Sequence, residues 1–111
     1  MEHPTAIRPE EHAIFKPEKM GKATIFESDR IMVGLNAFEP GQEHAPHTHC
    51  ERDKLYVGLR GQGIVTIGED ESEFGPGDVA LAPAGVMHSM RNPGPERLVV
   101  LVVMGPPPAT P

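Results

Sequence analysis

The sequence predicts an all-β antiparallel sandwich or barrel, and three observations carry that prediction. The chain has 111 residues, which suits one domain with a modest core. Glycine and proline contribute 12 and 13 of them, a density of helix-breaking residues that a helical bundle does not tolerate. The apolar runs are short and rich in β-branched residues, and they show no sustained 3.6-residue period.

The expected strands follow one another along the chain between polar or glycine-rich turns. Residues 27–30 form a polar break between the first two apolar runs. The Arg-Gly-Gln-Gly segment at 60–63 is typical of a hairpin turn. Acidic residues at 69–71 make the next turn, and a Gly-Pro-Gly segment at 75–77 leads into another run. The expected strands lie at 23–26, 31–38, 55–59, 64–67, 79–82 and 98–104.

Proline and charge divide the chain into three parts. Residues 1–20 carry three prolines among scattered charges and are expected to form an extended N-terminal arm. Residues 21–104 contain all the apolar runs and are expected to form the β-barrel domain. Residues 105–111 include four prolines and are expected to form a Pro-rich tail.

Charge and composition exclude several classes of protein. Ten basic and sixteen acidic residues give a net charge of −6, and the sequence has no basic stripe of the kind that binds nucleic acid. No apolar run approaches the roughly 20 residues that span a bilayer, and the N-terminus lacks the apolar segment of a signal peptide. Cys50 is the single cysteine, so no internal disulfide can form. These features predict a cytoplasmic protein without a nucleic-acid or membrane partner.

Histidine is over-represented, with six in the chain. His47 and His49 form a His-x-His pair, and residues two apart on a strand point to the same face. Their imidazoles can therefore converge on one ion, and a third ligand from a distant strand would leave coordination positions open for water or substrate. Taken alone, such a pair is more often a solvated surface feature than a metal site.

The surroundings of that pair form the first of two spaced motifs. Gly41 is followed by five residues, then by His47-Thr-His49, and later by Gly61.

The second motif begins at Gly77, and fifteen residues separate it from Gly61 at the end of the first. Five residues follow Gly77, and then come Pro83, Gly85, His88 and Asn92 at fixed spacing. Glycine at the turns permits tight connections between strands.

The two motifs resemble those of the cupin superfamily, and their short spacing is that of small single-domain bacterial cupins. The resemblance implies a double-stranded β-helix, a jelly-roll-like barrel, with the extended arm in front of it. It also implies a metal site in which His47, His49 and His88 act with an acidic residue as ligands of one divalent transition metal ion. Neutral imidazoles suit Fe, Mn, Ni, Cu or Zn, and the sequence does not choose among them.

The acidic ligand is where the sequence departs from the family pattern. Counting back from Gly61 puts Lys54 at the expected position, whereas counting on from His49 puts Asp53 there. We prefer Asp53, because it shares strand parity with the apolar residues of 55–59, which we expect to face the interior. The fallback is a site of three histidines, which some cupin dioxygenases use.

Other polar residues near the motif are given lesser roles. His44 lies in the spacer of the first motif and points away from His47 by parity, so it is expected in a loop or behind the ligands. Arg52, Lys54 and Arg60 would favour an anionic substrate if any of them reaches the mouth of the site.

The resemblance leaves two functions open. One is a metalloenzyme acting on a small oxygenated organic molecule, with dioxygenase-, isomerase- or lyase-like chemistry. The other is a non-catalytic module that binds a metal or a small molecule. No catalytic residue is assigned by the sequence.

A homodimer is also expected. A small barrel leaves sheet edges that partners commonly cover, and the run 98–104 is apolar on both faces. The arm could lie along the neighbour's sheet edge.

Overall fold

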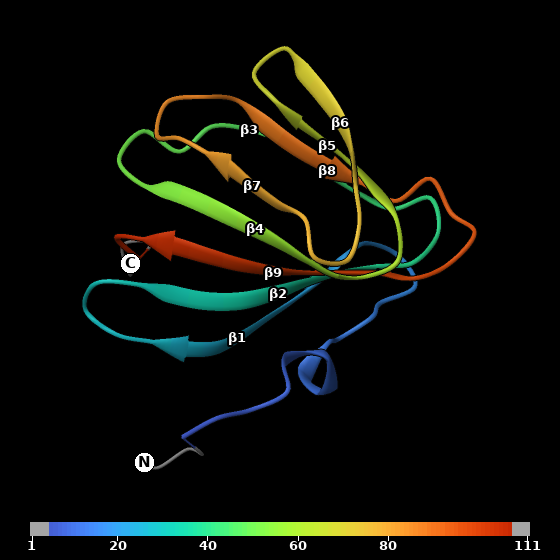
Figure 1. The fold of residues 1–111 in the computed structure, drawn as a ribbon, viewed down its shortest axis with the longest axis horizontal. Helices are drawn as coiled ribbons and strands as arrows, with labels where there is room; N and C mark the ends of the chain where they lie inside the picture. The colour runs from blue at the N-terminus through green and yellow to red at the C-terminus, as the bar shows by residue number, and fades with distance from the viewer. Residues whose placement is uncertain (1–4, 108–111) are drawn as a thin grey trace.

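The computed structural model describes residues 5–107 and contains two antiparallel β-sheets that face each other (Figure 1). A single turn of 3-10 helix, η1 (Pro9–His12), precedes the strands. The all-β prediction is therefore confirmed. The strands are β1 (Gly21–Glu27), β2 (Met32–Phe38), β3 (Glu43–His47), β4 (Asp53–Arg60), β5 (Gly63–Ile67), β6 (Asp70–Phe74), β7 (Val79–Ala82), β8 (His88–Arg91) and β9 (Leu98–Gly105).

The strand order of each sheet joins segments that are far apart in the chain. The larger sheet runs β1-β2-β9-β4-β7, and the smaller runs β3-β8-β5-β6. Strand β9 lies at the centre of the larger sheet, where it pairs with β2 on one side and β4 on the other. Three of these strands were not predicted from the sequence: β3, β6 and β8 are polar, so their composition carries no strand signal.

The core lies between the two sheets. The larger sheet contributes Phe38, Tyr56 and Leu98, each fully buried, and the smaller contributes Val65 and Met90. Burial of each such side chain contributes about 1.5–3 kcal/mol to folding. This packing fixes the spacing of the sheets and thereby the position of the side chains at the open end of the barrel.

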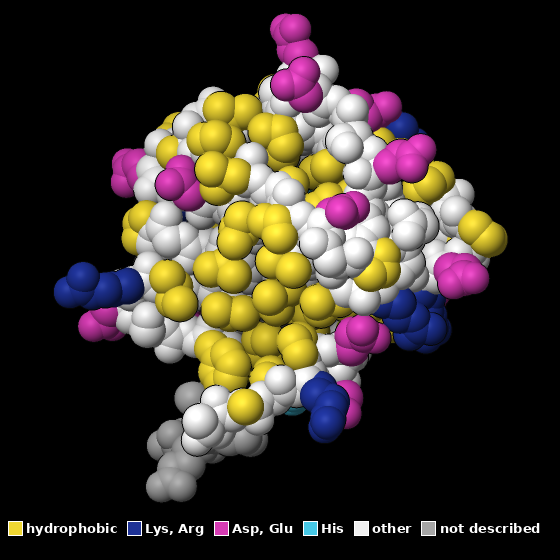
Figure 2. Space-filling model, viewed as in Figure 1, with side chains coloured by type: hydrophobic (Ala, Val, Ile, Leu, Met, Phe, Trp, Pro, Cys, Tyr) yellow, Lys and Arg dark blue, Asp and Glu magenta, His cyan; other side chains and the backbone are white. Residues whose placement is uncertain are grey.

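The outer face of the larger sheet is also apolar. Strand register aligns two cross-strand rows of apolar residues on this face. Figure 2 shows hydrophobic side chains gathered in a continuous band where Figure 1 draws β7, β4 and β9, with charged side chains at its rim. We call this surface the outer apolar face; its two rows are Val33, Val103, Leu55 and Leu81, and Leu101, Val57 and Val79, whereas Leu35, which pairs with Leu101, is buried.

The N-terminal arm packs on the barrel of its own chain. The Gln42 side-chain amide donates a hydrogen bond to the Lys16 carbonyl oxygen at 2.8 Å. The Arg97 guanidinium lies 4.2 Å from the centre of the Phe15 ring, and Met20 is buried in the core. These contacts hold residues 15–20 against the barrel of their own chain. Within residues 5–107 no helix is long and apolar enough to cross a membrane, and residues 108–111 of the expected tail lie outside the described residues.

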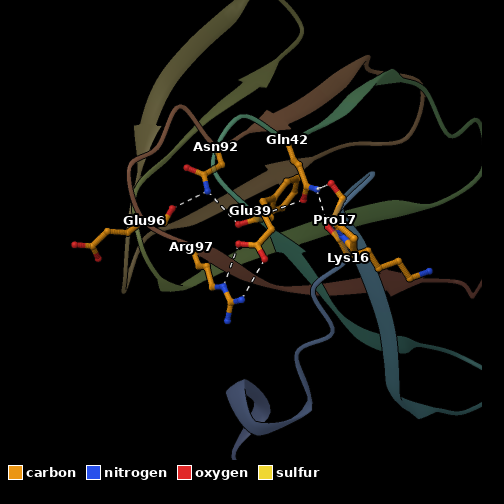
Figure 3. A network of polar contacts seen from close by, with 8 residues as sticks. Lys16, Pro17, Glu39, Gln42, Asn92, Glu96 and Arg97 are labelled. Atoms are coloured by element: carbon orange, nitrogen blue, oxygen red, sulfur yellow. Dashed lines mark hydrogen bonds and ion pairs between the residues drawn. The ribbon is translucent and has the colours of Figure 1, made fainter.

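Asn92 joins the loop that follows β8 to the end of β2 (Figure 3). The side chain is buried, and its amide nitrogen donates to the carbonyl oxygens of Phe38 at 3.0 Å and Glu96 at 2.8 Å. Its amide oxygen accepts from the Gly94 backbone N–H at 2.8 Å. Because the Asn92 side chain is buried and bonds to backbone groups of both β2 and the loop, it holds the loop between β8 and β9 against the barrel.

Replacing this residue is expected to destabilise the fold. Asn92→Ala removes the three hydrogen bonds of a buried amide, those to the Phe38 and Glu96 carbonyl oxygens and that from the Gly94 N–H, so the free energy of unfolding should fall by about 2–4 kcal/mol. Urea denaturation followed by circular dichroism measures this change.

The matched control is Glu39→Gln, which removes the neighbouring exposed ion pair with Arg97. That change should cost less than about 1 kcal/mol. Equal decreases in the free energy of unfolding of the two variants would show that the hydrogen bonds of Asn92 stabilise the fold no more than the exposed ion pair does.

Candidate metal centre

Pairing between β3 and β8 brings the first histidine of the His-x-His pair beside His88. The register aligns His47 with His88 across the two strands, and their ring centroids lie 4.1 Å apart. His88 begins β8 and is almost fully buried. His47 and His88 are 41 positions apart in the chain, yet their side chains lie side by side because their strands are hydrogen-bonded neighbours.

The turn before β8 positions His49. Gly85 adopts a backbone φ of +83°, a left-handed conformation that favours glycine. Its N–H donates to the His49 carbonyl oxygen at 2.7 Å. This bond fixes the segment after β3 against the turn, and the His49 ring lies 4.9 Å from that of His47 and 5.4 Å from that of His88.

The three histidines form a compact group. One nitrogen from each of His47, His49 and His88 lies within 4.8 Å of the other two, which is the spacing of ligands around one ion. The Nε2 atom of each ring is buried and has no hydrogen-bond partner within residues 5–107. Buried polar atoms in native proteins nearly always have partners, so three convergent exceptions point to a missing one.

Backbone contacts set the protonation of two of these rings. The Nδ1 atom of His47 lies 2.8 Å from the Ala45 carbonyl oxygen, and that of His88 lies 3.0 Å from the Val86 carbonyl oxygen. A carbonyl oxygen only accepts, so the proton of each neutral ring is on Nδ1 and the lone pair is on Nε2. Both rings are therefore oriented as metal ligands.

His49 is held differently. Its Nδ1 atom lies 3.2 Å from Nη1 of Arg52. A guanidinium only donates, so this contact leaves the lone pair of a neutral His49 on Nδ1 and its proton on Nε2. Use of Nε2 as a ligand would require the other tautomer and release of Arg52.

His44 lies next to the group, contrary to the parity argument. Its ring centroid is 4.2 Å from that of His47, because a β-bulge between the two residues inserts one extra position into β3. Pro46 lies in this bulge, and proline within a strand is a sequence signal for one. Sequence reasoning therefore missed a residue that lines the site.

The expectation that Asp53 faces the metal is not supported by the structure. Asp53 is exposed, lies outside the histidine group, and accepts a hydrogen bond from the Ala84 backbone N–H at 2.8 Å. The parity of β4 is the reverse of the expected one: Lys54 and Tyr56 face the interior and Leu55 and Val57 face outward. The count from Gly61 gave the correct register, and it places Lys54 at the position of the family's acidic ligand.

Burial keeps the imidazoles neutral. It lowers the pKa of His44 to about 3 and that of His49 to about 4, and it also lowers the pKa of His47 and His88. The nearby Lys54 ammonium adds to each effect. Burial in turn lowers the pKa of Lys54 to about 8. At neutral pH the site thus presents neutral imidazoles beside a cation.

A divalent transition metal fits these residues. The group offers three uncharged nitrogen donors, two of them with lone pairs already directed inward, and such donors suit Fe, Mn, Ni, Cu or Zn. A cavity of about 270 Å³ adjoins the group and is lined by His44, His47, His49 and Lys54 among others. A metal held by the histidines would therefore have space beside it for water or a small molecule.

Comparison with known proteins finds a matching protein family and a related bacterial protein. The family model of the cupin domain matches residues 34–104. A Streptomyces coelicolor protein described as uncharacterised is 35% identical over 77 residues, which is 69% of this chain and 71% of that protein.

Solved structures agree with the fold. The crystal structure of TT1209 from Thermus thermophilus has a TM-score of 0.89 and 39% identity, and the match covers 93% of this chain and 98% of that one. A Klebsiella pneumoniae protein with a double-stranded β-helix domain has a TM-score of 0.87 at 23% identity, covering 94% and 91% of the two chains. The predicted double-stranded β-helix is thereby confirmed.

The lowered histidine pKa values predict a stability that falls in acid. In metal-free protein, the unfolded chain takes up protons on these histidines near their ordinary pKa of 6.5, whereas the folded chain does so at lower pH, near 3 for His44 and near 4 for His49. The free energy of unfolding should therefore be highest above about pH 6.5 and fall as the pH drops toward 4. Urea denaturation across this pH range tests the prediction.

A single substitution should reduce that slope. His44→Gln removes one buried imidazole and should make stability less dependent on pH between 4 and 6.5. His12→Gln, which changes an exposed residue of η1, should leave the slope unchanged. A slope insensitive to His44→Gln would contradict the assignment of a neutral, buried ring.

Proposed function

The chain belongs to the cupin domain family, and from that premise we propose that it is a metal-dependent enzyme acting on a small oxygenated organic molecule at a mononuclear site. His47, His49 and His88 are the proposed ligands. The observation that carries the proposal is that the three rings bring one nitrogen each within 4.8 Å of the others, while their buried Nε2 atoms have no hydrogen-bond partner among residues 5–107.

The proposed chemistry depends on the open side of the histidine group. A divalent ion bound there would supply Lewis acidity toward substrate oxygens and, as iron, the means to activate dioxygen. The chain's own part is to hold the ligands and exclude bulk water. The Ala45 and Val86 carbonyl oxygens fix two ring orientations, and the adjoining cavity positions the substrate beside the group. This supports dioxygenase-, isomerase- or lyase-like reactions.

The second candidate is a non-catalytic module that binds a metal or small molecule at the same residues. The observation favouring it is that no carboxylate lies beside the three histidines within residues 5–107 to serve as a general base. Metal-loaded protein incubated with a panel of small oxo acids, enols and sugar acids separates the two. Oxygen uptake or product formation supports the enzyme, and binding without turnover supports the module.

We place either function in the cytoplasm, where the exposed Cys50 thiol stays reduced.

Metal binding is the direct test of the proposed ligands. Metal-free protein titrated with Zn²⁺ in a calorimeter should bind one ion per chain. His88→Ala should weaken binding at least tenfold, and the double variant His47→Ala, His88→Ala should retain no specific site, because one imidazole does not hold an ion in place.

Asp53→Asn is the matched control. It keeps an oxygen that accepts the Ala84 hydrogen bond but removes the carboxylate. Zn²⁺ affinity should be unchanged in this variant. A loss as large as that of His88→Ala would restore Asp53 as a ligand, and unchanged stoichiometry in the double variant would exclude the three-histidine site.

We also propose that two copies of the chain associate through the outer apolar face. Val79 and Leu81 are 61% and 53% exposed there, and both rows of this face lack ionisable groups. Copies of a chain with net charge −6 repel one another, so a charge-free sheet face is where they can meet. Two such faces can stack at about 10 Å, as in a β-sandwich.

Light scattering tests this association. The protein at micromolar concentration should have the mass of a dimer, and Leu81→Glu should convert it to a monomer by burying a charge in the contact. Met87→Glu, a change of an exposed apolar residue in the turn before β8 of the smaller sheet, should leave the dimer intact. A monomeric mass for the unaltered protein would contradict the proposal.

A further inference from the structure

The cavity beside the histidine group carries an excess of positive charge. Lys22, Arg52 and Lys54 line it, and within residues 5–107 its lining contains no carboxylate. A second cavity shares Lys22 and His44 with the first and adds Lys16 and Lys19. Together the two cavities gather five of the ten basic residues of the chain, against a single acidic residue, Glu43. An acidic protein thus has a basic entrance to its candidate site.

Lys54 lies at the inner end of this entrance. It is 1% exposed, and the partner that the structure gives its ammonium within residues 5–107 is the Tyr56 ring, whose centroid is 5.0 Å away. Buried cations are normally paired with an anion, because removal of a charge from water is costly. The structure supplies none here, so the site has one uncompensated buried positive charge.

The other unsatisfied groups of the cavity are donors. Nδ2 of Asn36 and Nε of Arg52 are buried without hydrogen-bond partners within residues 5–107, and both residues line the cavity with Lys54. Apart from the imidazoles, the cavity therefore offers N–H groups that require an acceptor. A metal ion in the histidine group would add further positive charge, which neutral imidazoles do not offset.

We propose that this cavity binds a small organic carboxylate, with the carboxylate held by Lys54 and Asn36 and the rest of the molecule directed toward the histidine group. One ammonium and one amide supply a donor for each of the two oxygens of a carboxylate, whereas a phosphate presents more oxygens than these two groups can bind. Lys16, Lys19 and Lys22 would attract the anion along the entrance. That this carboxylate is also the substrate rests on the function proposed above.

Binding of malonate to metal-free protein tests the proposal without the enzyme reaction. Titration calorimetry at low salt should show binding of malonate and none of malonamide, its uncharged analogue. Lys54→Met should weaken malonate binding at least tenfold, whereas Lys54→Arg, which keeps the charge, should retain part of it. Arg30→Met removes an exposed cation elsewhere and is the matched control, with unchanged affinity expected.

A second measurement uses the unaltered protein and so does not depend on the folding of a variant. Reductive methylation followed by mass spectrometry should modify Lys54 in free metal-free protein, and malonate should protect it. Equal modification with and without malonate, equal binding of malonamide, or full affinity in Lys54→Met would overturn the proposal. Tighter binding of inorganic phosphate than of malonate would overturn the choice of a carboxylate.

The metal-dependent function and the carboxylate site can be refuted independently of each other. Protein that binds malonate but does not bind Zn²⁺ would retain the anion site and lose the proposed metal-dependent function. Protein that binds Zn²⁺ but not malonate would retain the metal centre and lose the carboxylate site.

Discussion

The central physical constraint in this structure is the burial of polar groups that have no partner among residues 5–107. Lys54 carries a charge into the barrel, and beside it the Nε2 atoms of three imidazoles are buried without hydrogen bonds to any residue that the structure describes. Each such group reduces stability, so the rest of the fold has to offset the loss. The packed core between the sheets and the fully bonded Asn92 side chain provide that stability. Sites that bind ligands are commonly destabilising in the free protein for this reason.

The fold and the three histidines could be predicted from the sequence because they depend on spacing. The turns between strands need glycine at fixed positions, and those positions carry the two motifs. The face of β4 could not be predicted in the same way. Parity arguments assume that apolar residues face inward, yet Leu55 and Val57 belong to the outer apolar face, while the inward face carries Lys54 and Tyr56. When both faces of a strand contain apolar residues, hydrophobicity alone does not choose between them.

The position of His44 was missed for a different physical reason. Alternation of side chains holds only along an unbroken strand, and the bulge before His47 shifts it by one residue.

The net charge of the chain did not predict the charge around the site. The chain as a whole is acidic, but half of its basic residues lie around two adjoining cavities. The distribution of charge in space depends on strand pairing, which composition does not report.

The central place of β9 has a consequence for biosynthesis. It is the last of the described strands in chain order, yet it separates β2 from β4 in the larger sheet. Until β9 is synthesised, β2 and β4 each lack a partner on the edge that β9 later occupies, and their apolar side chains are exposed. A nascent chain in this condition is prone to pair with other chains. Completion of the sheet therefore waits for translation of β9, and the barrel closes only after release of that strand from the exit tunnel.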